Sequence, residues 1–591
     1  MKIRYLDGRR LYHAFLAGGE AVISDQNYLN KINVFPVPDS DTGTNLATTM
    51  RAISQRAKAS IAIHATMDSI ADAAISGARG NSGIIFAQFI YGLSREMKNE
   101  VKVSTRRFGE SVRRAVQYAH QAIVSPVEGT MITLIKDWAD AVFEQRQKMG
   151  DFVELLTYSL HVARTSLRDT PKKLQVLAKA GVVDAGAKGF VDFLEGVLNF
   201  IKKGNLKQIA RMQAAAPEIP AGAHVERRSV GRRFCSEALI VGRGLDAARM
   251  RSIVQKHGDS AVVAGSEEKV RIHVHTNSPA ELFDELKEFG TIAEIKADDM
   301  LRQYEAGHSP KSKIALVTDS ACDLPKAFLD EHQIHVIPFS LSFGESLYLD
   351  KVTITPSQFY AQRRASKVYP KTAQPPPAVV RAMFSFLASH YESVIVCTIS
   401  DKLTGMYELC LSAATGFPGK KISVINTKQI SGSQGLIVSR VAEAIRAGDS
   451  HDEVVALAER CIAATQLLVD VDSLKYLVRS GRVSHFKGFL ARLLNLKPVL
   501  ALVEGQAVSI SKSFGRRANM KKIMRMIRRT AGEKTVQKYA IVHAQVPERA
   551  DLYARELTKI FGRGPEFIMV ISPVIGVHTG LGVMGVALLT D

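Results

Sequence analysis

The chain of 591 residues has little cysteine and almost no tryptophan: five cysteines are scattered along it, and Trp occurs once. An odd number of scattered cysteines argues against a disulfide framework and indicates a reducing compartment. The sequence also lacks any run of about 18 uncharged apolar residues, so we expect no membrane-spanning helix. Because the N-terminus has no apolar signal core either, we expect a cytoplasmic protein.

Negative charge is scarce too, since 78 Lys and Arg residues against 58 Asp and Glu residues leave a formal net charge of +20. A surface of this kind attracts nucleic acid, anionic lipid or phosphorylated ligands. The sequence has no zinc-finger, RNA-binding or helix-turn-helix signature, so we do not expect a nucleic-acid partner. Peripheral contact with an anionic membrane stays open.

Five segments differ in pattern, as expected for a chain too long to form one core. Residues 1–203 have apolar positions at helical spacing, which predicts an all-α bundle or barrel. Residues 204–232 read as a linker, and 233–305 alternate strands and helices as a small α/β domain. A second linker, 306–312, precedes 313–591, where repeated strand–helix alternation predicts an α/β fold with parallel sheets and ligands at the carboxyl ends of their strands.

The segment Asn33-Val-Phe-Pro-Val-Pro-Asp-Ser-Asp-Thr-Gly-Thr-Asn45 places Asp39 and Asp41 two residues apart in a loop stiffened by prolines. Neighbouring carboxylates repel each other unless a cation lies between them. Oxygen ligands just before a helix, which we expect to begin near Leu46, suit Mg²⁺ that carries phosphate groups. An ordinary Pro/Asp/Gly turn is the alternative.

Three further turns are rich in small residues: Ser76-Gly-Ala-Arg-Gly-Asn-Ser-Gly83, Pro126-Val-Glu-Gly-Thr-Met131 and Val183-Asp-Ala-Gly-Ala-Lys-Gly189. Glycine and serine expose backbone N–H groups and let a phosphate approach closely. The first of these turns, taken alone, is explained equally well as a connection between helices. Four such loops that converge at one end of a bundle are harder to explain as ordinary turns.

The segment 33–45 and the first two of these turns resemble the ATP-binding domain of the dihydroxyacetone kinase superfamily, and most closely its bacterial fatty acid kinase branch. The resemblance implies a helical barrel that binds ATP and two Mg²⁺ ions. It makes Asp39 and Asp41 metal ligands and puts Asn33 where relatives have a third acidic ligand. The positions that it implies for nucleotide binding are Thr42, Gly43, Thr44, Asn45, Ser76, Gly77, Gly80, Asn81, Ser82, Gly83, Gly129, Thr130, Met131, Asp184 and Gly186.

A His-x-His pair lies on the predicted strand Val270-Arg-Ile-His-Val-His-Thr276, where alternation puts His273 and His275 on the same face. Such a pair alone is more often a surface or core feature than a pair of ligands. The middle domain of fatty acid kinases has the same element and a matching cysteine segment. This resemblance implies a Zn²⁺ site of Cys235, His273 and His275, with a fourth position open, so zinc could be structural or catalytic.

Five runs mark residues 313–591: Val317-Thr-Asp-Ser-Ala-Cys-Asp-Leu-Pro325, Lys371-Thr-Ala-Gln-Pro375, Ile399-Ser-Asp-Lys-Leu-Thr-Gly-Met-Tyr407, Ser480-Gly-Arg-Val-Ser484 and Val574-Ile-Gly-Val-His-Thr-Gly-Leu-Gly582. They resemble the DegV fatty-acid-binding family along nearly the full length of this part. The resemblance implies two subdomains and a buried tunnel for one long acyl chain. Its implied fatty-acid-binding residues are Thr372, Thr404, Gly405 and His578, since hydroxyls and an imidazole hold a carboxylate without burying a permanent ion pair.

The resemblances together indicate a fusion of a kinase with an acyl-binding protein. They predict a fatty acid kinase that uses ATP and Mg²⁺ to convert the carboxylate of a bound long-chain fatty acid into an acyl phosphate, which an acyltransferase would accept. Asp39, Asp41 and Arg482 are its candidate catalytic residues, and Arg482 would offset charge during transfer. Two alternatives remain: a kinase for a small dihydroxyacetone-like substrate, and a non-enzymatic lipid carrier whose nucleotide domain senses ATP.

The short second linker limits how transfer can occur, because it reaches at most roughly 25 Å when extended. Transfer between the two chains of a homodimer is therefore the alternative to transfer within one chain.

Overall fold

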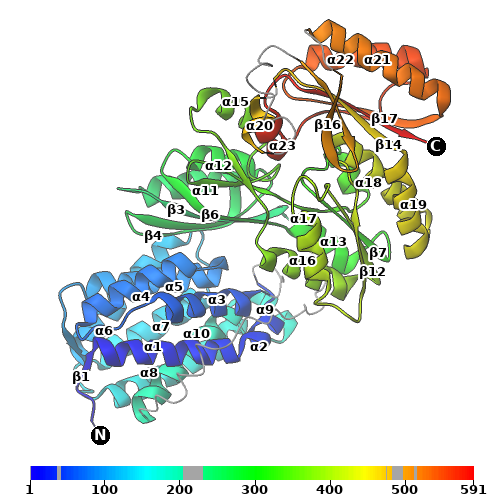
Figure 1. Ribbon diagram of the computed structural model, residues 1–591. Coiled ribbons are helices and arrows are strands. Elements are labelled where there is room, and N and C mark those ends of the chain that lie inside the picture. The colour runs from blue at the N-terminus through cyan, green and yellow to red at the C-terminus, as the bar shows by residue number, and fades with distance from the viewer. Residues whose placement is uncertain (1, 36–40, 204–230, 474, 482–496, 512–514) are drawn as a thin grey trace. The chain divides into compact units, whose positions relative to one another are not determined.

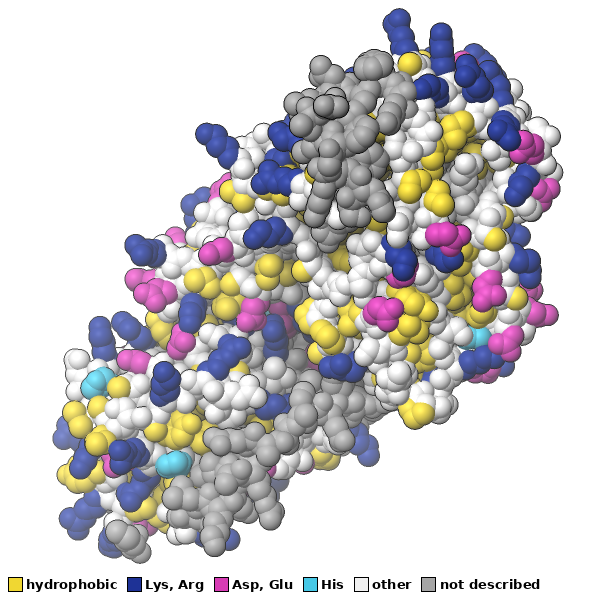
Figure 2. All heavy atoms as spheres, viewed as in Figure 1, with side chains coloured by type: hydrophobic (Ala, Val, Ile, Leu, Met, Phe, Trp, Pro, Cys, Tyr) yellow, Lys and Arg dark blue, Asp and Glu magenta, His cyan; other side chains and the backbone are white. Residues whose placement is uncertain are grey.

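The computed structural model describes residues 2–35, 41–203, 231–473, 475–481, 497–511 and 515–591 (Figure 1). The chain divides into two compact units, Met1–Met300 and Leu301–Asp591. Lys and Arg side chains are distributed over the visible surface of both units, in keeping with the net charge of +20 (Figure 2). Every helix in the described parts of the chain is too short or too polar to traverse a bilayer.

The first part of unit 1 is helical, as the spacing of its apolar residues predicts. Its helices are α1 (Gly8–Ser24), α2 (Gln26–Lys31), α3 (Thr42–Arg56), α4 (Ile63–Gly77), α5 (Gly80–Glu96), α6 (Thr105–Ala122), α7 (Met131–Gln145), α8 (Phe152–Lys173), α9 (Gln175–Ala180) and α10 (Ala185–Lys203). A short antiparallel ribbon joins β1 (Tyr5–Asp7) to β2 (Lys102–Ser104). Aromatic rings from three helices fill the middle of the core, where Phe86 and Phe193 meet edge to face at 5.0 Å and Trp138 and Phe190 at 5.6 Å.

Two helix boundaries in this part differ from the sequence expectation. Helix α3 begins at Thr42 rather than near Leu46, so the small polar residues after Asp41 form its first turn. Only Ala78 and Arg79 separate α4 from α5. The turn expected over residues 76–83 is therefore mostly the end of one helix and the start of the next.

The rest of unit 1 is a four-stranded antiparallel sheet of order β4-β5-β3-β6 with two helices. Its elements are β3 (Phe234–Val241), α11 (Ala247–His257), β4 (Gly258–Gly265), β5 (Lys269–Thr276), α12 (Pro279–Leu286) and β6 (Thr291–Asp299). Buried Val262 and Ala264 of β4 join the core of the helical domain. This sheet is thus packed onto the helices, and β6 is a strand that the sequence reading missed.

Unit 2 contains the remaining elements. They are β7 (Ile314–Asp319), α14 (Lys326–Glu331), β8 (His335–Ile337), β9 (Ser340–Phe343), β10 (Ser346–Leu349), α15 (Pro356–Ala365), β11 (Lys371–Ala373), α16 (Pro377–His390), β12 (Ser393–Thr398), α17 (Met406–Ala414), β13 (Lys421–Asn426), α18 (Ser431–Ala447), α19 (His451–Ala464), β14 (Thr465–Asp470), α20 (Lys475–Arg479), β15 (Val499–Val503), β16 (Gln506–Ser511), α21 (Arg516–Glu533), β17 (Val536–His543), α22 (Pro547–Phe561), β18 (Ile568–Val570), α23 (Pro573–Thr579) and β19 (Met584–Thr590). Helix α13 (Met300–His308) precedes them, so the start of the segment expected as a linker, residues 306–308, is helical.

The expectation of parallel sheets is right for one sheet of unit 2 and wrong for the others. The sheet β13-β12-β7-β8 is parallel throughout. The six-stranded sheet β16-β15-β14-β19-β17-β18 is antiparallel except between β17 and β18, and β10-β9-β11 is antiparallel. Alternating side chains on β14, Leu467 and Leu468, enter separate cores, one with α18 and α19 and the other with α21 and α22. The six-stranded sheet is therefore covered on both faces.

Candidate functional site

The N-termini of four long helices of unit 1 meet at one place. A Cβ atom on Gly80, at the start of α5, would lie 2.2 Å from Asn45 Nδ2 in the first turn of α3. A Cβ atom on Gly186, in the first turn of α10, would lie 2.9 Å from Ser82 Oγ of α5 and 3.2 Å from Met131 Cβ of α7. A larger residue at either position would crowd these side chains, and Gly80 also has a positive φ of 57°. The four small-residue turns therefore converge, and helix N-termini favour anions.

Buried Asp184 ties two of these helix ends together. Its carboxylate accepts hydrogen bonds from the backbone amides of Ala187 at 2.8 Å and of Met131 and Gly186. Burial raises the pKa of Asp184 to about 6, although the three amides oppose the shift. Asp184 thus fixes the starts of α7 and α10 from inside the site.

Residues of the neighbouring sheet hold the turn between α4 and α5. Glu237 of β3 accepts a hydrogen bond from the Gly80 amide at 2.8 Å, and the same carboxylate lies 3.4 Å from Arg79. Fully buried Arg271 of β5 donates to the carbonyl of Ser76. The Gly80 amide is therefore engaged by Glu237 rather than open to a phosphate, and the sheet sets the position of this turn.

The antiparallel register of β3 and β5 forms the Cys/His cluster. Cys235 pairs with His275, and Glu237 pairs with His273, so the four residues lie side by side on one face of the sheet. The ligand atoms of Cys235, His273 and His275 all lie within 4.8 Å of one another. A thiolate and two imidazoles are a donor set that Zn²⁺ prefers, and His273 Nε2 is buried with no hydrogen-bond partner among the described residues. The cluster fits the implied zinc ion.

Electrostatics link this cluster to the nucleotide end. Burial raises the pKa of the Cys235 thiol, and the charge of Asp41 adds to the increase. Burial would also raise the pKa of Glu237, but its hydrogen bond with His273 and the charges of Lys296 and Arg79 hold it below its usual value. Asp41 and the cluster therefore lie close enough for their charges to interact.

Glu237 and Lys296 are site residues that the sequence reading did not assign. Lys296 lies on β6 directly opposite Glu237 of β3. The run Ile292-Ala-Glu-Ile-Lys296 alternates only in part and is a weak strand signal. The Cys-Ser-Glu spacing is the signal that puts Glu237 on the face of Cys235.

The Mg²⁺ ligands implied by the resemblance are described in part. Asp41 immediately precedes α3, is half-buried and makes no capping hydrogen bond with its side chain, which suits a hard oxygen ligand. Asn33 is buried, and its backbone N–H donates a hydrogen bond to the backbone carbonyl of Asn30 at 3.3 Å. Asn81 Oδ1 is buried without a hydrogen-bond partner among the described residues, as expected beside a ligand. Asp39 lies outside the described residues.

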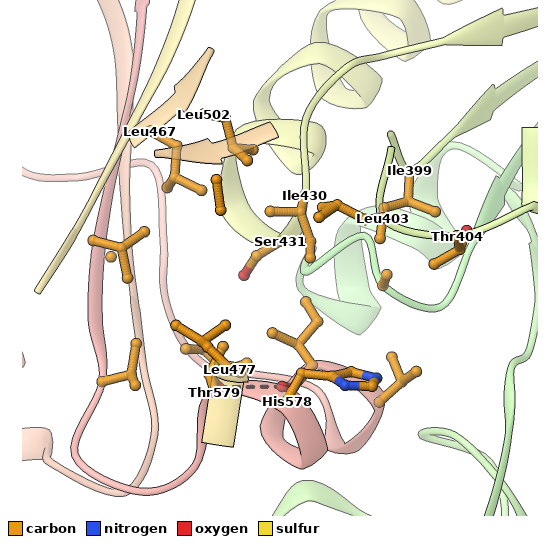
Figure 3. Close-up of a pocket in the computed structure, with 18 of the residues that line it drawn as sticks. Ile399, Leu403, Thr404, Ile430, Ser431, Leu467, Leu477, Leu502, His578 and Thr579 are labelled. Carbon is orange, nitrogen blue, oxygen red and sulfur yellow. Dashed lines mark hydrogen bonds between the residues drawn. The ribbon is translucent and has the colours of Figure 1, made fainter. Parts of the chain in front are cut away.

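Unit 2 encloses an apolar cavity of about 260 Å³. Aliphatic side chains from β14, β15, α20 and the residue just before α18 line it, among them Leu467, Leu502, Leu477 and Ile430. Figure 3 shows Leu467 and Leu502 on one side of this space and the Thr404 and His578 side chains away from them. A cavity of this character binds a long apolar group and orients it by the few polar groups on its wall.

All four predicted fatty-acid-binding residues line the cavity. Thr372 of β11 and His578 of α23 hydrogen-bond through Oγ1 and Nε2 at 3.0 Å, although 206 positions separate them. Thr404 also lines the cavity, and Gly405 precedes α17, where a Cβ atom would lie 2.6 Å from the Gln374 side chain. Gly405 lines the cavity as well. Arg482 lies outside the described residues.

Three family models match consecutive parts of the chain. Residues 36–199 match the DAK2 domain, residues 231–307 match the FakA-like middle domain of fatty acid kinase, and residues 313–591 match the uncharacterised proteins of the DegV family. The predicted fusion of these three domain types is confirmed, as is the predicted multidomain fold class.

The relatives and solved structures cover only parts of this arrangement. The chain is 29% identical to an uncharacterized protein of Staphylococcus saprophyticus over 51% of its own length and 56% of that protein. It is 30% identical to Protein YloV of Bacillus subtilis over 53% of its own length and 59% of that protein, so it spans less than two thirds of these relatives. Structures of DegV, a fatty acid binding protein from Bacillus subtilis, and of a DegV family protein from Thermus thermophilus each cover 47% of this chain, at 26% and 28% identity. The matched regions include 100% and 99% of those two solved chains, and the TM-scores are 0.45 and 0.44.

Proposed function

We propose that this protein is a fatty acid kinase that phosphorylates the carboxylate of a fatty acid held in unit 2. The observation that carries the proposal is the apolar cavity with Thr372 and His578 hydrogen-bonded at 3.0 Å on its wall. A hydroxyl and an imidazole suit a carboxylate head group, and the cavity suits an acyl chain. The matches to a DAK2 domain and to a fatty acid kinase middle domain in the same chain support the second substrate, ATP.

The reaction needs positioning and charge neutralisation more than a strong base. A fatty acid is already a carboxylate near pH 7, so it is a nucleophile without proton removal. One carboxylate oxygen forms a bond to the γ-phosphorus of ATP. The bond from that phosphorus to the β–γ bridging oxygen breaks, and its electron pair leaves with ADP. The products are an acyl phosphate and ADP, with no change of oxidation state.

Asp41, with Asp39 and Asn33, would hold Mg²⁺ beside the four converging helix N-termini. Bound Mg²⁺ would neutralise charge on the β- and γ-phosphates. Asp184 would keep the starts of α7 and α10 in place, while Glu237 and Arg271 would keep the turn before α5 in place. Zinc would be held by Cys235, His273 and His275. These residues are buried or half-buried, apart from Asp39, which lies outside the described residues.

The test is fatty-acid-dependent ADP release from the full chain, together with mass spectrometry of the lipid that copurifies. We expect Asp41→Asn to abolish ADP release and leave the lipid bound, and His578→Ala to lose the lipid. The matched control is Asp169→Asn, which changes a partly exposed carboxylate on α8 and should affect neither. Lipid-independent turnover with dihydroxyacetone would overturn the proposal, and lipid binding without any turnover would make the protein a carrier.

A mixing experiment distinguishes transfer within one chain from transfer between two chains of a homodimer. Asp41→Asn retains the acyl site, and His578→Ala retains the nucleotide site. If transfer occurs between chains, an equimolar mixture of the two variants recovers ADP release that neither has alone. If transfer occurs within one chain, the mixture stays inactive.

A further inference from the structure

Two arginines in unit 2 are held against two tyrosines. The guanidinium carbon of Arg479 lies 4.0 Å from the centre of the Tyr369 ring. That of Arg363 lies 4.9 Å from the Tyr369 ring and 5.7 Å from the Tyr476 ring. The two rings are nearly parallel, with centroids 6.4 Å apart and an interplanar angle of 16°. We call these four residues the Arg–Tyr cluster.

The Arg–Tyr cluster is built on the segments that carry the polar end of the acyl cavity. The Tyr369 hydroxyl donates to the carbonyl of Val577 at 2.6 Å, one residue before His578. Tyr369 also lies three residues before Thr372. Leu477, the residue after Tyr476, lines the cavity near His578 (Figure 3). The cluster and the Thr372–His578 pair therefore belong to one local structure.

No acidic side chain among the described residues forms an ion pair with the Arg–Tyr cluster. The sequence has no Asp or Glu from Lys351 through Tyr391, nor from Ser473 through Val503. Among the described residues, neither Arg363 nor Arg479 forms an ion pair, and Arg479 is exposed while Arg363 is half-buried. A guanidinium that stacks on a ring uses its face and keeps its N–H groups, which lie in the plane, for another acceptor.

We propose that Arg363 and Arg479 form a phosphate subsite next to the carboxylate end of the cavity. Its ligand is the phosphate of an acyl phosphate, whose acyl chain stays in the cavity. Two fork-shaped donors match the geometry of a phosphate dianion, and the two tyrosines hold them in position. The inference rests on the proposed function and extends it to retention of the product.

The test compares two probes on the full, delipidated chain by displacement of a fluorescent fatty acid. Hexadecyl phosphate mimics the product without hydrolysing, and hexadecanoate mimics the substrate. We expect Arg363→Gln/Arg479→Gln to weaken hexadecyl phosphate binding about tenfold or more, the loss typical of a charged hydrogen bond. Hexadecanoate binding should change less than about twofold, which also shows that the variant is folded.

The control Arg364→Gln/Arg446→Gln removes the same charge from two exposed positions of unit 2. It should leave the binding of both probes unchanged. Unchanged hexadecyl phosphate binding in the test variant, or an equal loss in the control, would overturn the phosphate subsite and leave the acyl site intact. A wild-type chain that binds neither probe would overturn the proposed function as well.

Discussion

The carboxylate of Glu237 accepts a hydrogen bond from the backbone amide of Gly80 at 2.8 Å, across 157 positions of sequence. The same oxygen lies 3.3 Å from Nδ1 of His273. One buried side chain thus joins the first residue of α5, in the candidate nucleotide site, to the Cys/His cluster. Metal binding and nucleotide binding are therefore expected to affect each other through Glu237.

Glu237→Ala removes this connection and leaves Arg79 without one of its two carboxylate partners. We expect affinity for a non-hydrolysable ATP analogue to fall about tenfold, because a charged hydrogen bond that positions the turn is lost. Isothermal titration calorimetry with Mg²⁺ present measures this affinity. The control is Glu285→Ala, because Glu285 also pairs with a histidine, His257, in the same domain. Equal affinities in the two variants would contradict the role of Glu237.

Cys235→Ser should abolish zinc binding at the Cys/His cluster, if the proposed site holds zinc. A serine hydroxyl is a far weaker zinc ligand than a thiolate, so the remaining histidines would not retain the ion during dialysis. Elemental analysis of the wild-type chain should give about one Zn²⁺ per chain, and the variant close to none. Cys461→Ser, also a buried free cysteine but in unit 2, is the control and should keep the metal. Zinc retained by Cys235→Ser would place the ion elsewhere.

Leu502→Phe should shift the acyl chains that the protein carries toward shorter lengths. Leu502 lines the cavity on the side away from Thr404 (Figure 3), and a larger ring there would occupy part of the volume. Mass spectrometry of copurified lipid measures the change. Leu552→Phe makes the same substitution at an exposed position of α22 and should leave the lipid profile unchanged. An unchanged profile in Leu502→Phe would show that the chain does not reach this wall.

Asp350 should make unit 2 less stable as the pH rises. Burial raises its pKa to about 7, although the charge of Lys351 opposes the shift. The unfolded carboxyl ionises near 3.8, so wild-type stability contributed by the protonated form is present below pH 3.8 and is lost as the pH rises toward 7. Relative to Asp350→Asn, the wild-type chain should lose on the order of 4 kcal/mol of unfolding free energy over this range, at about 1.4 kcal/mol per unit of pKa.

Native-state hydrogen exchange of the α23 amides at pH 5 and pH 8 measures this difference, because the Val574 amide donates to Asp350 at 3.2 Å. The variant should gain protection relative to wild type at the higher pH. Asp452→Asn, at an exposed ion pair with Lys421, is the control. A difference between variant and wild type that does not grow with pH would contradict the raised pKa.

Much of the fold follows from local pattern. Helical spacing of apolar residues predicted the helical domain, and alternation predicted that His273 and His275 share a face. The same patterns could not predict strand direction, since alternation is identical in parallel and antiparallel strands. The six-stranded sheet was therefore expected to be parallel and is mainly antiparallel. Strand β6 was missed because its alternating side chains are mostly half-buried and mixed in polarity.

The candidate sites, like the fold, follow in part from local sequence and in part from tertiary structure. The sequence by itself determined which segments carry the chemistry, because carboxylates, small-residue turns and the His-x-His pair are local features of residue type and spacing. Only the tertiary structure decided that Glu237 engages Gly80, that Thr372 meets His578, and that two tyrosines hold Arg363 and Arg479. These partners are brought together by strand register and by packing between distant segments, which depend on the whole fold and are not visible in any one stretch of sequence.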